Sequence, residues 1–162
     1  MKNNQNNYAF IDTNNLYLAI KHLGWKIDWF KFRKYLKNRF HIQKAFIFIG
    51  KRKDYENLYL IFQKAGFEVI FKKVIEQKEK TKGNVDIDIA VWVMHYLYNE
   101  KFDKIMLITG DGDFYTLAQY LNERGKLLNI AVPNKNAYSA LLRKFSRVYV
   151  SEWKKKVEHK KR

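Results

Sequence analysis

The sequence predicts an α/β protein, a three-layer α/β/α sandwich around a central and mainly parallel sheet. Short runs rich in Ile, Val, Phe and Tyr alternate with longer amphipathic segments along the chain, and this alternation is typical of a doubly wound sheet. The chain has 162 residues, of which 47% are hydrophobic, and no cysteine. It is therefore long enough to bury one core without disulfide bonds.

Each expected strand is a short apolar run that ends at a turn or a helix signal. In chain order, we expect strands over residues 8–11, 44–49, 67–74, 105–109, 127–132 and 147–150.

Six helices are expected between these strands, over residues 14–23, 28–40, 54–65, 86–98, 114–124 and 136–145. Asp28 and Asp54 stand where an N-cap is wanted, and Gly66 and Gly125 stand where a left-handed residue ends a helix. Residues 1–150 then form the domain. Residues 151–162 are Lys-rich and are expected to form a basic tail, either a frayed helix or a disordered arm.

The charge of the chain predicts a phosphate-rich partner. There are 32 Lys and Arg against 16 Asp and Glu, a formal net charge of +16, and cations that neutralise phosphates supply most sequence-independent affinity for nucleic acid. An A/T-rich genome would also enrich Lys, Asn, Ile, Phe and Tyr, but codon bias alone does not favour Lys over Glu. We therefore expect a nucleic acid as the partner.

Four aspartates stand where such a sheet would bring its strand ends together. Asp12 follows the first strand, Asp111 and Asp113 follow the strand over 105–109, and Asp86 opens a helix. Ligands of open α/β sheets bind outside the carboxyl ends of the strands. Carboxylates about 4 Å apart repel by roughly 4 kcal/mol at an effective dielectric of 20, so a cluster here needs a cation.

Simpler structural roles exist for two of these residues. Asp113 could cap the following helix while Gly110 and Gly112 make a tight turn, and Asp86 could cap its own helix. At about 100° per residue, however, Asp86 lies on the same side of its helix as Ile89 and Val93. Its carboxylate is therefore aimed toward the sheet, whereas Asp88 points away and is a weaker candidate.

Three motifs resemble those of a known family. They are Ile11-Asp12-Thr13-Asn14-Asn15-Leu16, Lys82-Gly83-Asn84-Val85-Asp86, and Ile108-Thr109-Gly110-Asp111-Gly112-Asp113-Phe114. In this order they look like the signatures of NYN domains, which belong to the PIN-like nuclease superfamily, in the LabA-like (DUF88) branch. The resemblance runs from Tyr8 to about Val150 and implies a PIN-like, flavodoxin-like sandwich with an acidic, metal-binding pocket.

The resemblance implies a metal-dependent ribonuclease with Mg²⁺ or Mn²⁺ as cofactor and with 5′-phosphate and 3′-hydroxyl products. The implied metal-binding and catalytic residues are Asp12, Asp86, Asp111 and Asp113. Supporting groups would be Asn15, Asp88 and Thr109. RNA contacts are expected from loops beside the pocket, at Lys51, Arg52, Lys53, Lys78, Lys80 and Lys82, and base stacking from exposed aromatics, for which Trp25, Tyr115 and Tyr138 are the candidates.

One departure from the family pattern leaves a second function open. Many relatives carry an acidic residue six positions after the Asp86 equivalent, where this chain has Trp92. The alternative is a catalytically weak RNA-binding or regulatory module with the same fold. A haloacid-dehalogenase-type phosphatase is less favoured, because its nucleophile motif needs a second aspartate where this chain has Asn14. The four histidines show no spacing of an acid/base pair.

The remaining expectations concern location and assembly. The first seven residues are polar, and no stretch reaches 18 uninterrupted apolar residues, so we expect a cytoplasmic protein with neither a signal peptide nor a membrane span. A homodimer could extend the RNA-binding groove.

Overall fold

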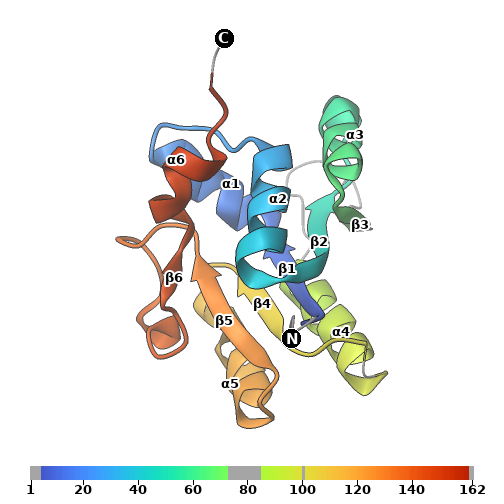
Figure 1. The fold of residues 1–162 in the computed structure, drawn as a ribbon, viewed down its shortest axis with the longest axis vertical. Helices are drawn as coiled ribbons and strands as arrows, with labels where there is room; N and C mark the ends of the chain where they lie inside the picture. The colour runs from blue at the N-terminus through green and yellow to red at the C-terminus, as the bar shows by residue number, and fades with distance from the viewer. Residues whose placement is uncertain (1–4, 73–84, 100, 161–162) are drawn as a thin grey trace, which may run out of the picture.

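The computed structural model describes residues 5–72, 85–99 and 101–160. Its centre is a six-stranded, fully parallel sheet with the strand order β3-β2-β1-β4-β5-β6 (Figure 1). The predicted sandwich is confirmed. This doubly wound order differs from the 2-1-3-4-5 order of flavodoxin. The strands are β1 (Asn7–Asp12), β2 (Ile42–Gly50), β3 (Glu68–Lys72), β4 (Ile105–Ile108), β5 (Leu127–Val132) and β6 (Val148–Tyr149).

Helices cover both faces of the sheet (Figure 1). One core lies under α1 (Thr13–His22), α2 (Trp29–Phe40), α3 (Glu56–Ala65) and α6 (Lys154–Val157). The other core lies under α4 (Val85–Tyr98) and α5 (Tyr115–Glu123). Strand β1 shows why both faces are apolar: Ala9 and Ile11 pack into the first core, whereas Tyr8 and Phe10 pack into the second.

Local signals fix several helix ends as predicted. The Asp28 side chain accepts a hydrogen bond of 3.1 Å from the backbone N–H of Lys31 and caps α2. Gly66 ends α3 with φ +99°, and Gly125 follows α5 with φ +66°, backbone conformations that favour glycine. Asp54 is not a cap, because it lies inside a 3-10 turn, η1 (Lys53–Tyr55), and α3 begins without a side-chain cap.

The helix expected over residues 136–145 is wrong. This segment forms turns and one short 3-10 helix, η3 (Ala140–Leu142). The backbone N–H of Ser139 donates to the carbonyl of Gly110, and the Ser139 hydroxyl accepts from the N–H of Leu141. These bonds hold the segment against the turn that follows β4, so tertiary contacts replace the helical ladder.

The expectation of a loose basic tail is also wrong over the described residues. After β6 the chain forms η4 (Val150–Trp153) and then α6, and Trp153 and Val157 are buried in the first core. These two residues are four apart and share one helical face, while Lys154, Lys155 and Lys156 are exposed. The carbonyl of Val157 accepts from the N–H of Asp28 at 2.8 Å. Residues 151–157 therefore complete the domain.

No helix in the described part of the chain is both long enough and apolar enough to cross a membrane.

Candidate metal centre

The topology opens a crevice between β1 and β4. These neighbours run parallel with Ile11 beside Ile108, so Asp12 and Thr109 follow side by side at the carboxyl edge of the sheet. The chain then leaves β1 toward α1 on one face and leaves β4 toward α5 on the other. Such a switch in direction is where doubly wound proteins bind their ligands.

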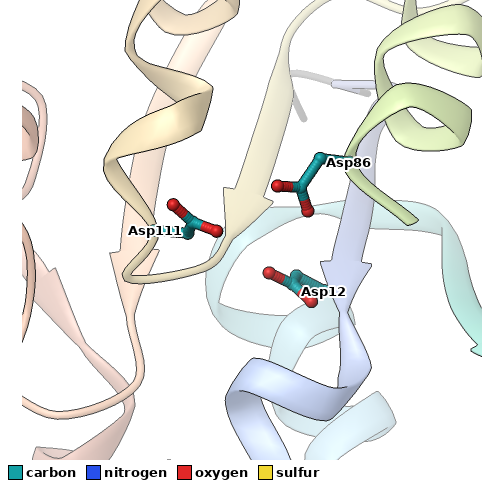
Figure 2. Close-up of side chains that lie close together, drawn as sticks. All are labelled: Asp12, Asp86 and Asp111. Carbon is teal, nitrogen blue, oxygen red and sulfur yellow. The ribbon is translucent and has the colours of Figure 1, made fainter. Parts of the chain in front are cut away.

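Three carboxylates converge in this crevice. Asp12 ends β1, Asp111 follows β4, and Asp86 lies in the first turn of α4. One carboxylate oxygen of each lies within 4.8 Å of the others, and Figure 2 shows the three side chains pointing toward a common space. As predicted from its position on the helix, Asp86 faces the sheet rather than solvent.

The environment raises the pKa of two of these carboxyl groups. Burial raises the pKa of Asp12, which is 7% exposed, and hydrogen bonding from Thr109 and the nearby backbone N–H of Asn15 oppose this shift. Burial first, and then the negative charges of Asp12 and Asp111, raise the pKa of Asp86 from 3.8 to about 7. Near neutral pH the metal-free site is therefore partly protonated, and a cation can displace that proton.

Thr109 ties two of the acidic residues together. Its hydroxyl donates to Oδ2 of Asp12 at 3.0 Å and accepts from the backbone N–H of Asp111 at 3.1 Å. The hydroxyl hydrogen is therefore committed to Asp12, and the Asp12 carboxylate is fixed in one orientation. Thr109 is 1% exposed, so this link is shielded from competing water.

The turn after β4 presents Asp111 to the crevice. Oδ1 of Asp111 accepts from the backbone N–H of Asp113 at 2.9 Å, so Asp111 caps the 3-10 helix η2 (Gly112–Phe114). A side chain at Gly112 would collide with Ser139, which explains this glycine. The interpretation of Asp113 as the cap is thus wrong, and α5 begins without a side-chain cap.

The supporting residues lie in different places. Oδ1 of Asn15 accepts from the backbone N–H of Gly110 at 2.9 Å, so Asn15 links α1 to the Asp111 turn. Asp113 is exposed and lies outside the group of three, although its charge contributes to the raised pKa of Asp86. Asp88 is half-buried and also lies outside the group.

The expected RNA contacts are partly described. Lys51, Arg52 and Lys53 are exposed beyond the end of β2, at the same edge of the sheet as Asp12 because β1 and β2 are parallel. Three further expected contacts, Lys78, Lys80 and Lys82, lie outside the described residues.

The three aromatic residues predicted to stack on RNA bases differ in their burial. Trp25 is only 8% exposed and belongs to the first core, so its predicted stacking role is wrong. Tyr115 and Tyr138 are half-buried and stay candidates.

Ser139 is the supporting residue that sequence reasoning missed. Its backbone N–H donates to the carbonyl of Gly110, and its side chain lies where a side chain at Gly112 would collide with it. Ser139 lies 27 positions after Gly112, and no local pattern links the two. The resemblance did, however, include the segment that contains it.

The donor set suits a hard divalent cation. Three carboxylates offer only oxygen atoms, which Mg²⁺ and Mn²⁺ prefer. The chain has no cysteine, and no histidine belongs to the group of three. The three carboxylates repel one another, and the raised pKa of Asp86 reflects this repulsion. A bound cation would offset it.

The fold and the acidic cluster agree with a family assignment from sequence. The NYN domain family model matches residues 8–152. The chain belongs to the NYN domain family. The match contains the three aspartates of the cluster and extends from β1 into η4, so the resemblance inferred from the motifs is confirmed.

Two individual proteins are similar to this NYN domain protein. The Low amplitude and bright protein LabA of Synechococcus elongatus is 29% identical over 132 residues, covering 76% of this chain and 70% of LabA. A crystal structure of a protein of unknown function from Vibrio parahaemolyticus has a TM-score of 0.75 and 19% identity, covering 92% of this chain and 94% of that one. The chain is therefore a LabA-like NYN protein with a nuclease-like domain, and the Vibrio likeness shows the fold alone.

Proposed function

We propose that this protein hydrolyses phosphodiester bonds of single-stranded RNA, with Mg²⁺ or Mn²⁺ bound at the acidic cluster. The observation that carries the proposal is the convergence of Asp12, Asp86 and Asp111 at the strand switch point. Family membership supports a nuclease-like function. The positive charge of the chain supports a polyanionic substrate.

In this proposal the three aspartates hold the cation, and Asp113 contributes at the rim, directly or through water. A bound divalent cation lowers the pKa of a coordinated water and offsets charge on the scissile phosphate. Asp86 has a pKa of about 7 in the metal-free protein, so cation binding near neutral pH displaces its proton and leaves the carboxylate free to act as a ligand.

The other residues at the site act by positioning. Thr109 fixes the Asp12 carboxylate, and Asn15 holds the Asp111 turn through Gly110. Neither residue carries a charge. Substitution of either should therefore change the geometry of the carboxylates and the metal affinity together.

Substrate binding is assigned to the basic loops at the same edge. Lys51 and Arg52 each lie over an aromatic ring. Nζ of Lys51 is 5.9 Å from the ring centroid of Phe71, and Cζ of Arg52 is 5.5 Å from that of Tyr55. Both of these rings are exposed, at 39% and 40%, so cation and aromatic face can meet phosphate and base of an unpaired strand. Lys53, Lys78, Lys80 and Lys82 are proposed as further RNA contacts.

The test is cleavage of labelled single-stranded RNA by the wild type and by Asp111→Asn, with Mn²⁺, with Mg²⁺ and with EDTA. We expect cleavage that requires metal and falls at least 100-fold in Asp111→Asn. Glu123→Gln is the matched control, because it removes an exposed carboxylate at the far end of α5 and should retain full activity. RNA binding is measured on the same samples.

The alternative is an RNA-binding or regulatory NYN module with weak catalysis. Trp92 motivates it, because this position carries a half-buried indole that packs near Tyr96 rather than a carboxylate. Salt-sensitive RNA binding without cleavage under either metal would favour this alternative. A Trp92→Glu variant that gains metal-dependent cleavage would identify the missing acidic group as the cause.

A further inference from the structure

Helix α4 carries an exposed apolar seam that faces away from the sheet. Its members are Ile87, Val91, Met94 and Tyr98, with exposed fractions of 61%, 61%, 37% and 89%. Their spacing of four, three and four residues keeps them within about 60° of one another on the helix. Ile89 and Val93, on the opposite side, are almost fully buried. Helix α4 is therefore apolar on two faces, and the sheet covers only one of them.

Charge selects the occupant of this seam. Helices α1, α2, α3 and α6 each carry Lys or Arg, with five such residues in α2, whereas α4 and α5 carry none. Two molecules with a net charge of +16 repel across most of their surfaces. Because α4 carries no Lys or Arg, pairing of two α4 helices brings no cationic side chain of the helix itself into the contact.

The flank of the seam is complementary to itself. Asp88 and His95 lie on one side of the seam, seven residues apart. In an antiparallel pair of α4 helices centred between Val91 and Met94, Asp88 of each copy lies on the same side as His95 of the other, offset by roughly 3 Å along the axis. A twofold axis thus generates two carboxylate–imidazole pairs from one surface, as an isologous interface requires.

We propose that this protein forms a twofold-symmetric dimer through antiparallel pairing of the α4 seams. Fully exposed apolar side chains of this size offer roughly 150–200 Å² each, so the seam exposes about 400 Å² per copy. That is about half of what each partner buries in an interface of standard size. Asp88 and His95 on the flank would add to this area.

The dimer has a consequence for the acidic clusters. Each α4 begins beside its own cluster at Asp86 and has 14 residues. Antiparallel pairing therefore places the two clusters at opposite ends of the paired helices, separated by about 20 Å along the helix axes at 1.5 Å per residue. The proposal itself does not depend on catalysis, and its test needs neither RNA nor metal.

The first experiment is sedimentation velocity of the wild type, Val91→Glu and Leu60→Glu over a range of concentrations. The control residue Leu60 lies on α3 and is also an exposed apolar side chain, at 51%. We expect the wild type and Leu60→Glu to approach twice the chain mass of 19.6 kDa, and Val91→Glu to stay monomeric. A wild type that is monomeric up to roughly 100 µM, or a dimer that persists in Val91→Glu, overturns the proposal.

The second experiment tests the antiparallel register, using the absence of native cysteine. Antiparallel pairing places Ile87 opposite Tyr98 of the second copy, whereas Tyr98 and its own symmetry mate lie about 16 Å apart along the axis. A short thiol crosslinker should join Ile87→Cys to Tyr98→Cys in a mixture and should join neither variant to itself. Efficient crosslinking of each variant alone would show parallel pairing and overturn the proposal.

Discussion

Replacing Asp86 by asparagine should stabilise the metal-free protein at pH 8. In the wild type, burial and the charges of Asp12 and Asp111 raise the pKa of Asp86 from 3.8 to about 7. A shift of this size corresponds to about 4 kcal/mol at a pH well above 7. Because Asp86 is only partly buried, solvent screening reduces this to roughly 1–2 kcal/mol. Asparagine keeps the shape and removes the charge.

The sign of the pH dependence follows from the direction of the shift. The pKa of Asp86 is higher in the folded state than in the unfolded state, so its contribution to stability is fully present below about pH 4. That contribution is lost as the pH rises through about 7. The advantage of Asp86→Asn over the wild type should therefore be largest at pH 8 and shrink steadily toward pH 4.

Urea unfolding of both proteins with a chelator, at several values of pH, measures this difference. We expect Asp86→Asn to gain about 1–2 kcal/mol at pH 8, or about 3–6 °C in melting temperature. Adding Mn²⁺ should stabilise the wild type more than the variant, because only the wild type keeps all three carboxylates. A variant that is less stable than the wild type at pH 8 without metal would show that the Asp86 charge does not destabilise the folded protein.

Three further predictions concern the same residues and the core. As the pH is raised toward 7, the Mn²⁺ affinity of the wild type should increase by up to about tenfold per pH unit and level off near pH 8, because the cation displaces the proton on Asp86. Calorimetry measures this affinity, and an affinity that does not change with pH would contradict the prediction. Thr109→Val should cost about 1–3 kcal/mol in chemical denaturation, because it removes the side-chain donor to the buried Asp12 carboxylate. It should also weaken Mn²⁺ binding, whereas Thr109→Ser, which keeps the hydroxyl, should retain both properties. In the same assay, Trp153→Ala should lower the free energy of unfolding by about 3–5 kcal/mol. The exposed control Lys155→Ala should lower it by less than about 0.5 kcal/mol. Equal effects would mean that the C-terminal segment is not part of the core.

Much of the architecture could be predicted because its signals are local. Apolar runs such as 105–108 and 127–132 mark buried parallel strands, and Asp28 and Gly66 mark helix ends by their own backbone chemistry. The inward direction of Asp86 follows from helical periodicity alone. Parallel strands bring their carboxyl ends to the same edge of the sheet, so the convergence of the three aspartates could also be predicted.

The rest depends on contacts between distant residues. Residues 136–145 have a helical pattern, but Ser139 is bonded to the turn at Gly110 and the segment does not form a long helix. Trp153 lies in a Lys-rich stretch that resembles a solvated tail, and only packing against α2 shows that it belongs to the core. In both cases the deciding partner is far away in the sequence and leaves no local pattern.

The acidic cluster of Asp12, Asp86 and Asp111 is proposed to be a metal-dependent nuclease site. Its most direct test follows single-turnover RNA cleavage and Mn²⁺ binding together, on the same samples of wild type and Asp12→Asn, as the Mn²⁺ concentration is raised. We expect the cleavage rate to rise in parallel with metal occupancy in the wild type, and both to be lost in Asp12→Asn. Cleavage that persists in Asp12→Asn, or that is unaffected by EDTA, would contradict the account.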